Sequence, residues 1–160
     1  MTVSRPFALL AGGWSRPGRS KRWAIAILVC LSSLAGAVSV ASVVGVPYAR
    51  THDELSYLLA ADTYARGRLA NPEHPMWQFF ETPHVLQQPT YMSKYQPAQG
   101  VALALGSRLG GRPILGVWIS AALMCATVLW MLLAWLPPRW AIFGAVLTSL
   151  QFGMTGYWAQ

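Results

Sequence analysis

Three long stretches of the chain consist of apolar and small residues without a charged side chain. They cover residues 23–49, 113–138 and 140–160, and they are 27, 26 and 21 residues long. A helix of about 20 apolar residues crosses a hydrocarbon core of roughly 30 Å, and these stretches lack the alternation of barrel strands. The pattern predicts an all-α integral membrane protein with three transmembrane helices, at residues 23–49, 113–137 and 140–158.

A more polar loop, residues 50–112, separates the first two predicted spans and contains two shorter helical patterns. The Thr-His-Asp-Glu sequence at 51–54 has the form of a capping box, which predicts a helix over 52–66. Pro97 suits the first position of a second helix, over 97–109, which is too short to cross a bilayer. Both helices are expected to be amphipathic and to lie at the membrane interface, joined by an irregular, proline-rich strap.

The distribution of charge predicts how the chain is oriented. Residues 1–22 contain five basic residues and no acidic one, which places this segment in the cytoplasm. The loop 50–112 is then exported, and the short turn 138–139 returns to the cytoplasm. We therefore expect a multi-pass protein of the bacterial cytoplasmic (inner) membrane. A cleaved signal peptide is the alternative for the first span, because residues 36–42 are mostly small.

Composition supports a membrane protein over the other common classes. The chain is 54% hydrophobic and only 11% charged, whereas soluble domains carry about 25% charged residues. The net charge of +7 does not indicate nucleic-acid binding, because the N-terminal basic residues lead directly into an apolar run. Cys30 and Cys125 both lie in apolar stretches, so no disulfide framework is expected.

A few polar residues of the loop are candidates for chemistry. Asp53 and Glu54 are adjacent carboxylates just beyond the first span, where one could accept a proton from a hydroxyl group; acids also favour the first turn of any helix. Lys94 could bind a phosphate or simply meet lipid headgroups, and Arg50 is a further phosphate candidate. Tyr57 could stack on a sugar or anchor the interface.

A metal site has little support in the sequence. His52, His74 and His84 are scattered, so no resident cofactor is expected, although a divalent cation is compatible with the acidic residues of the loop.

The order of these features resembles a known family. The segments HDELSYLLAADTYARGRLANP and SKYQPAQGVALALG are similar to the N-terminal part of the GT-C membrane glycosyltransferases, in the bacterial branch related to protein O-mannosyltransferases and lipid A aminoarabinose transferases. The resemblance implies that Asp53, with Glu54 beside it, is the catalytic carboxylate. It also implies that Lys94 contacts the phosphate of a lipid carrier. From their own positions in the loop, we expect Tyr95, Arg50 and Tyr57 to be further substrate contacts.

The resemblance implies a reaction and partners. The expected activity is transfer of a sugar from a polyprenyl-phosphate donor to a glycan, lipid or protein acceptor at the outer membrane face. Because the family has more spans, the chain is expected to be the N-terminal, donor-site fragment of a larger fold.

Two non-enzymatic alternatives remain. One is a membrane scaffold or truncated remnant that pairs with partner helices through the small residues Ser33, Ala37, Ala41 and Gly45. The other is a transporter subunit, which the absence of charges inside the spans disfavours.

Overall fold

The computed structural model describes residues 17–46 and 48–154, and the fold is 70% helical. The described chain divides into two compact units. The terminal unit takes its residues from Met1–Val43 and Ala121–Gln160, and the central unit is Val44–Ser120. Helix α4 (Ile114–Trp135) begins in the central unit and continues into the terminal unit.

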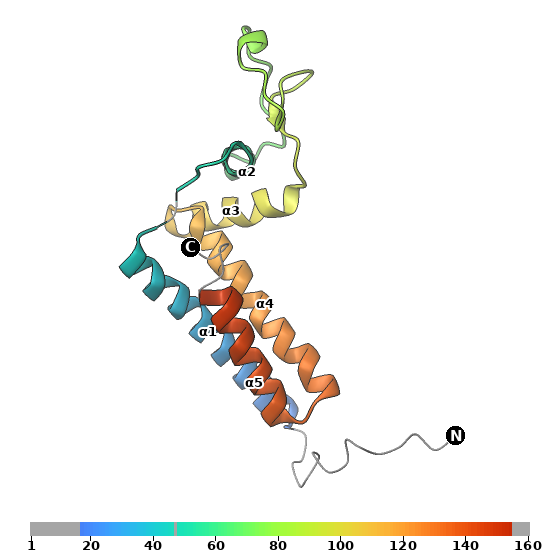
Figure 1. The fold of residues 1–160 in the computed structure, drawn as a ribbon. Coiled ribbons are helices and arrows are strands. Elements are labelled where there is room, and N and C mark those ends of the chain that lie inside the picture. Colours follow the sequence, from blue (N-terminus) through green and yellow to red (C-terminus); the bar gives the residue numbers. More distant parts are fainter. Residues whose placement is uncertain (1–16, 47, 155–160) are drawn as a thin grey trace, which may run out of the picture. The chain divides into compact units, whose positions relative to one another are not determined.

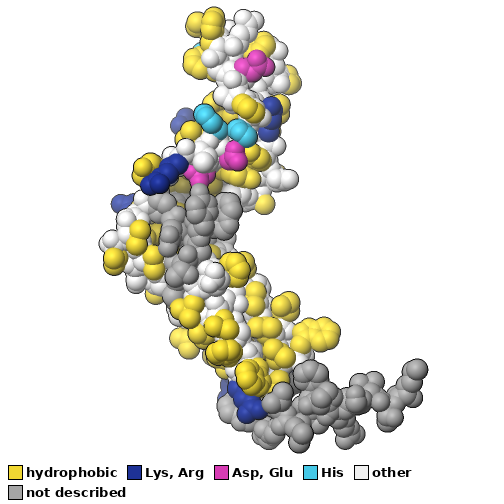
Figure 2. Space-filling view, viewed as in Figure 1, with side chains coloured by type: hydrophobic (Ala, Val, Ile, Leu, Met, Phe, Trp, Pro, Cys, Tyr) yellow, Lys and Arg dark blue, Asp and Glu magenta, His cyan; other side chains and the backbone are white. Residues whose placement is uncertain are grey.

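The terminal unit is built from helices (Figure 1). Beside α4 it contains α1 (Arg19–Val44), α5 (Pro138–Thr148) and η3 (Ser149–Met154), a π-helical continuation of α5. Their buried side chains form one apolar core, which includes Ala26, Val29, Cys125, Leu129, Leu133, Ala141 and Ala145. Many large apolar side chains of these helices remain on the surface (Figure 2), as is usual for helices that face lipid.

Small residues let α1 pack closely within this unit. Ser33, Ala37 and Ala41 are almost completely buried, and the Ser33 hydroxyl lies 3.6 Å from the Cys125 sulfur of α4. Nearly three helical turns toward the N-terminus of α1, the Trp23 and Trp130 rings meet edge to face with their centres 4.5 Å apart. The small-residue face that the sequence offers to a partner helix is therefore largely covered by the chain itself.

Two of the described helices, α1 and α4, are long and apolar enough to cross a membrane. The first begins at Arg19 rather than at residue 23, because Arg and Lys are good helix formers. It ends at Val44, ahead of Gly45, whose φ of +101° is outside the helical region. The third expected span is not among them: α5 begins at Pro138 and passes into η3 after Thr148, and residues 155–158 of that span lie outside the described part of the chain.

The central unit contains two helices that pack against each other (Figure 1). Helix α2 spans His52–Ala65 and α3 spans Pro97–Gly110, close to the ranges expected for the two loop helices. Gly100 of α3 is buried against Ala60 and Tyr64 of α2, and a Cβ at this position would overlap both side chains. A glycine is thus required for this close approach.

Glycines also form the turn from α3 into α4. A Cβ on Gly106 would collide with the backbone of Gly116, and a Cβ on Gly116 would collide with the backbone of Ala102. Gly111 ends α3 in the left-handed conformation, with φ of +71°, which glycine adopts without strain. The two helices can therefore touch backbone to backbone.

The segment between α2 and α3 contains more order than the expected irregular strap. It has a short 3-10 helix, η2 (Trp77–Phe79), and two antiparallel strands, β1 (Val85–Leu86) and β2 (Met92–Ser93). An isolated bridge between Asn71 and Tyr91 extends the pairing. Strands of two residues are too short to produce a recognisable alternation of polar and apolar positions, so the sequence pattern does not show them.

The tight packing at Ser33 gives a stability prediction. Replacing Ser33 with Leu should lower the free energy of unfolding by about 1–3 kcal/mol, because the larger side chain has no room beside Cys125. The neighbouring Ser32 is exposed, so Ser32→Leu provides the same chemical change without the clash. Thermal unfolding in detergent should show a lower melting temperature for Ser33→Leu alone. Equal melting temperatures for the two variants would contradict the packing described.

Candidate functional site

The candidate site is built around the first turn of α2, which begins with a capping box. The Glu54 carboxylate accepts hydrogen bonds from the backbone N–H groups of Arg50, at 2.6 Å, and Thr51, at 3.2 Å. The Thr51 side chain accepts a bond from the third helical residue in return. This confirms the box expected from the sequence. The Glu54 side chain is therefore directed back toward residues 50 and 51, whereas the Asp53 side chain is directed toward His84.

These backbone hydrogen bonds also change the acidity of Glu54. The N–H group of Arg50, followed by that of Thr51, holds the pKa of Glu54 below its usual value of 4.5. Both donors favour the ionised form of the carboxylate. Glu54 thus remains charged and engaged in the cap at neutral pH.

A buried serine attaches the β1–β2 hairpin to α2. The Ser56 hydroxyl donates to the backbone carbonyl of His84 at 2.7 Å and lies 2.8 Å from the Ser93 hydroxyl. Because Ser56 uses its single proton on His84, the Ser93 hydroxyl must donate to Ser56. Ser93 in turn accepts from the backbone N–H of Tyr95 at 3.2 Å. This chain of bonds fixes His84 and Tyr95 beside the start of α2.

The result is a line of three polar side chains. The Nε2 atom of His84 lies 3.1 Å from the Asp53 carboxylate, and its Nδ1 atom lies 2.7 Å from the Tyr95 hydroxyl. The Asp53 side chain remains 57% exposed, whereas that of His84 is 31% exposed. A carboxylate is therefore held in place by an imidazole and is still open to a substrate. His and acidic side chains lie together on this surface in Figure 2.

Aromatic rings surround this line in nearly parallel planes. Tyr57 stacks on Tyr95 at 4.7 Å with 19° between the planes, and Tyr95 lies at 16° to His84. His52 is inclined 13° to His84 at 6.5 Å. Partial removal from solvent raises the pKa of the Tyr95 phenol above 10.0, and the Asp53 charge raises it further. Tyr95 therefore keeps its proton at neutral pH.

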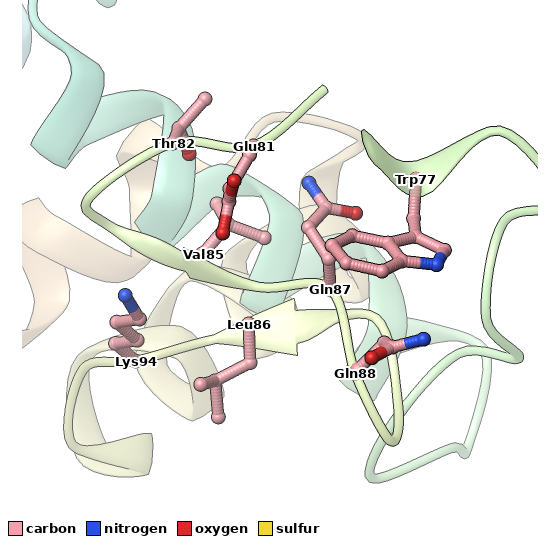
Figure 3. Close-up of a pocket in the computed structure, with 8 residues that line it drawn as sticks. All are labelled: Trp77, Glu81, Thr82, Val85, Leu86, Gln87, Gln88 and Lys94. Atoms are coloured by element: carbon pink, nitrogen blue, oxygen red, sulfur yellow. The ribbon is translucent and has the colours of Figure 1, made fainter. Parts of the chain in front are cut away.

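Lys94 lies next to this cluster and borders a small pocket (Figure 3). Its backbone N–H donates to the His84 carbonyl at 3.2 Å, and its ammonium group donates to the Pro83 carbonyl at 2.9 Å. The pocket has a volume of about 230 Å³. Lys94 lies at one end of it in Figure 3, and Trp77 and Gln88 lie at the other. The pocket is lined by Trp77, Glu81, Thr82, Val85, Leu86, Gln87, Gln88 and Lys94.

The structure thus brings some of the expected site residues together and separates others. Asp53 and Tyr95 meet at His84, and Tyr57 stacks on Tyr95. Glu54 is in the helix cap, Lys94 faces the pocket, and Arg50 lies over the Tyr48 ring at 4.7 Å. Within residues 17–46 and 48–154, no group of three or more His, Cys, Asp or Glu side chains is placed to hold a metal ion.

His84 is the residue that the sequence analysis missed as a partner of Asp53. It is 31 positions away along the chain, and the sequence pattern shows it only as one of three scattered histidines. Predicting the hairpin would have identified His84 as a partner of Asp53, because pairing of residues 84–86 with 92–94 turns His84 back toward α2.

Comparisons with protein-family models, with curated proteins and with solved structures find no match for this chain.

The helix cap predicts a dependence on pH. Because the pKa of Glu54 is lower in the folded chain, its ionisation stabilises the cap above pH of about 4.5, and this contribution is lost as the pH falls through the folded value. The amide NMR signals of Arg50 and Thr51 should therefore shift together on acidification. They should not titrate in Glu54→Gln, whereas Glu81→Gln, an exposed control, should leave the transition unchanged. A transition that persists in Glu54→Gln would refute the assignment.

Proposed function

We propose that this chain acts in the transfer of a sugar from a polyprenyl-phosphate donor to an acceptor hydroxyl at the outer face of the bacterial cytoplasmic membrane. The observation that carries the proposal is the exposed Asp53 carboxylate, held by His84 at the start of α2. Its place in the sequence, between a span-length helix and the Ser-Lys-Tyr segment, is the basis of the resemblance to the GT-C glycosyltransferases.

The chemistry needs a base, and Asp53 suits this role. Its carboxylate takes the proton of the acceptor hydroxyl as the oxygen forms a bond to the anomeric carbon of the sugar. The bond from that carbon to the phosphate oxygen breaks, and the polyprenyl phosphate leaves with the bonding electrons. Attack from the face opposite the leaving group inverts the configuration at this carbon. Glu54 is assigned to the helix cap because both of its contacts are with the backbone.

The leaving phosphate needs a positive charge, and Lys94 is the proposed source. Its ammonium group uses one of its three protons on the Pro83 carbonyl, which leaves two for phosphate oxygens. Lys94 is exposed, and its backbone is bonded to His84, the residue that holds Asp53. The base and the phosphate-binding group are therefore attached to the same hairpin, and Tyr57 and Tyr95 offer ring faces to the sugar.

The membrane setting supports a lipid-linked donor. Helices α1 and α4 are long and apolar enough to span a bilayer, and they flank the central unit in the sequence. We propose α5 and η3 as part of a third span, with residues 1–22 in the cytoplasm and 50–112 outside. A nucleotide sugar made in the cytoplasm does not reach that side, whereas a polyprenyl-phosphate sugar is carried across. In this proposal the chain supplies the donor-site part of a larger multi-span enzyme.

Replacement of the proposed base tests the activity. Asp53→Asn should lower transfer of labelled sugar from polyprenyl phosphate by at least about 100-fold, because an amide cannot accept the proton. Asp62→Asn is the matched control, since Asp62 lies on the exposed surface of the same helix and pairs with Arg66. It should retain activity. The assay uses membranes that contain the chain, and product is counted on the acceptor. Equal activity of the two variants would reject Asp53 as the base.

The orientation is tested by cysteine labelling in intact cells. Leu69, 83% exposed in the central unit, should react as Leu69→Cys with a membrane-impermeant maleimide added from outside. Leu136, next to the turn between α4 and α5, should react as Leu136→Cys only after the cells are permeabilised. The unchanged chain, whose Cys30 and Cys125 lie in α1 and α4, controls for background. Protection of Leu69→Cys in intact cells would reverse the proposed topology.

A further inference from the structure

His84 is placed by contacts that do not involve its ring. Its carbonyl oxygen accepts hydrogen bonds from the Ser56 hydroxyl at 2.7 Å and from the backbone N–H of Lys94 at 3.2 Å. Both bonds fix the backbone of the hairpin at this point. The fixed backbone therefore holds the imidazole next to Asp53 and Tyr95, and changes to the ring need not displace the backbone.

The proton on the ring follows from what its neighbours can do. An ionised Asp53 carboxylate can only accept a hydrogen bond, so the Nε2 atom of His84, at 3.1 Å, must carry a proton. In a neutral imidazole the Nδ1 atom then has a free electron pair. The Tyr95 hydroxyl, 2.7 Å from Nδ1, must donate to it. Each of the three groups has one consistent role.

Tyr95 is held in the position that this role requires. Its ring stacks on Tyr57, and its backbone N–H bonds to the Ser93 hydroxyl. Burial, then the Asp53 charge and a hydrogen bond to Asp53, raise the pKa of the phenol, so that it keeps its proton. His52 of α2 also lies near the His84 ring, at 6.5 Å between ring centres, while the Lys94 ammonium group is directed to the Pro83 carbonyl.

We propose that Asp53 and Tyr95 together select the Nε2–H tautomer of the neutral His84 ring and that this imidazole orients the Asp53 carboxylate, so that His84 and Tyr95 are positioning residues of the site. The tautomer follows from these two distances for an ionised Asp53 and a neutral ring. Its effect on sugar transfer rests on the proposed function, in which Asp53 is the base. A carboxylate held by one fixed donor keeps its other oxygen directed at the acceptor hydroxyl.

The tautomer can be measured without any activity. Nitrogen NMR of the chain labelled with 15N-histidine, in detergent and mildly alkaline buffer, should show a protonated Nε2 and an unprotonated Nδ1 for one ring, whose signals disappear in His84→Gln. Tyr95→Phe should shift the Nδ1 signal of this ring, because Nδ1 loses its donor, while Nε2 keeps the proton that Asp53 accepts. Tyr91→Phe makes the same change elsewhere in the hairpin and should leave the signals unchanged.

Three results would overturn the tautomer assignment. They are a proton on Nδ1 in the unchanged chain, a mixture of tautomers already present in it, and signals that do not respond to Tyr95→Phe. A Tyr95→Phe chain whose amide spectrum otherwise matches that of Tyr91→Phe excludes misfolding as the cause of a response.

The positioning role is tested separately by kinetics. In membranes where the chain supports transfer, Tyr95→Phe should lower kcat by roughly 10- to 100-fold with little change in KM, as expected for a misdirected base. His84→Gln keeps a donor for Asp53 and should retain more activity than His84→Ala. If Asp53→Asn is inactive while Tyr95→Phe and His84→Ala keep full kcat, the positioning role is rejected. If Asp53→Asn is active, the proposed function fails and the measured tautomer still stands.

Discussion

The buried hydroxyl of Ser56 is the contact on which the candidate site depends. It joins α2 to the β1–β2 hairpin through the His84 carbonyl and the Ser93 hydroxyl, and its residue is only 1% exposed. A strand pair of two residues on each side has little stability of its own. The hairpin therefore needs a partner, and a hydrogen bond in a buried place costs more to break than an exposed one. With the hairpin anchored, His84 and Tyr95 are fixed beside Asp53.

The two adjacent carboxylates illustrate how backbone geometry separates the roles of similar side chains. Glu54 reaches back to two backbone N–H groups at the helix start, and its pKa is lowered by them. Asp53, one position earlier, projects to the hairpin and meets an imidazole. Successive residues of a helix point about 100° apart, so one acid stabilises the helix while the other is available to a substrate.

Close packing in both units depends on residues that have small side chains or none. In the terminal unit Ser33 and Ala37 are buried, and in the central unit Gly100, Gly106 and Gly116 leave no space for a Cβ. Helices in lipid gain little from the hydrophobic effect between them, and they associate through close van der Waals contact. Close contact through small residues therefore suits a chain whose surface remains largely apolar.

The sequence by itself determined the helices and the helix cap. Long uncharged runs imply α1 and α4. The Thr51–Glu54 box marks where α2 begins, and Pro97 marks where α3 begins, because each of these signals acts within a few residues. Only the tertiary structure decided that His84 and Tyr95 join Asp53 while Lys94 faces a pocket. That arrangement rests on a short hairpin and on hydrogen bonds between residues far apart in the chain, which no local pattern records.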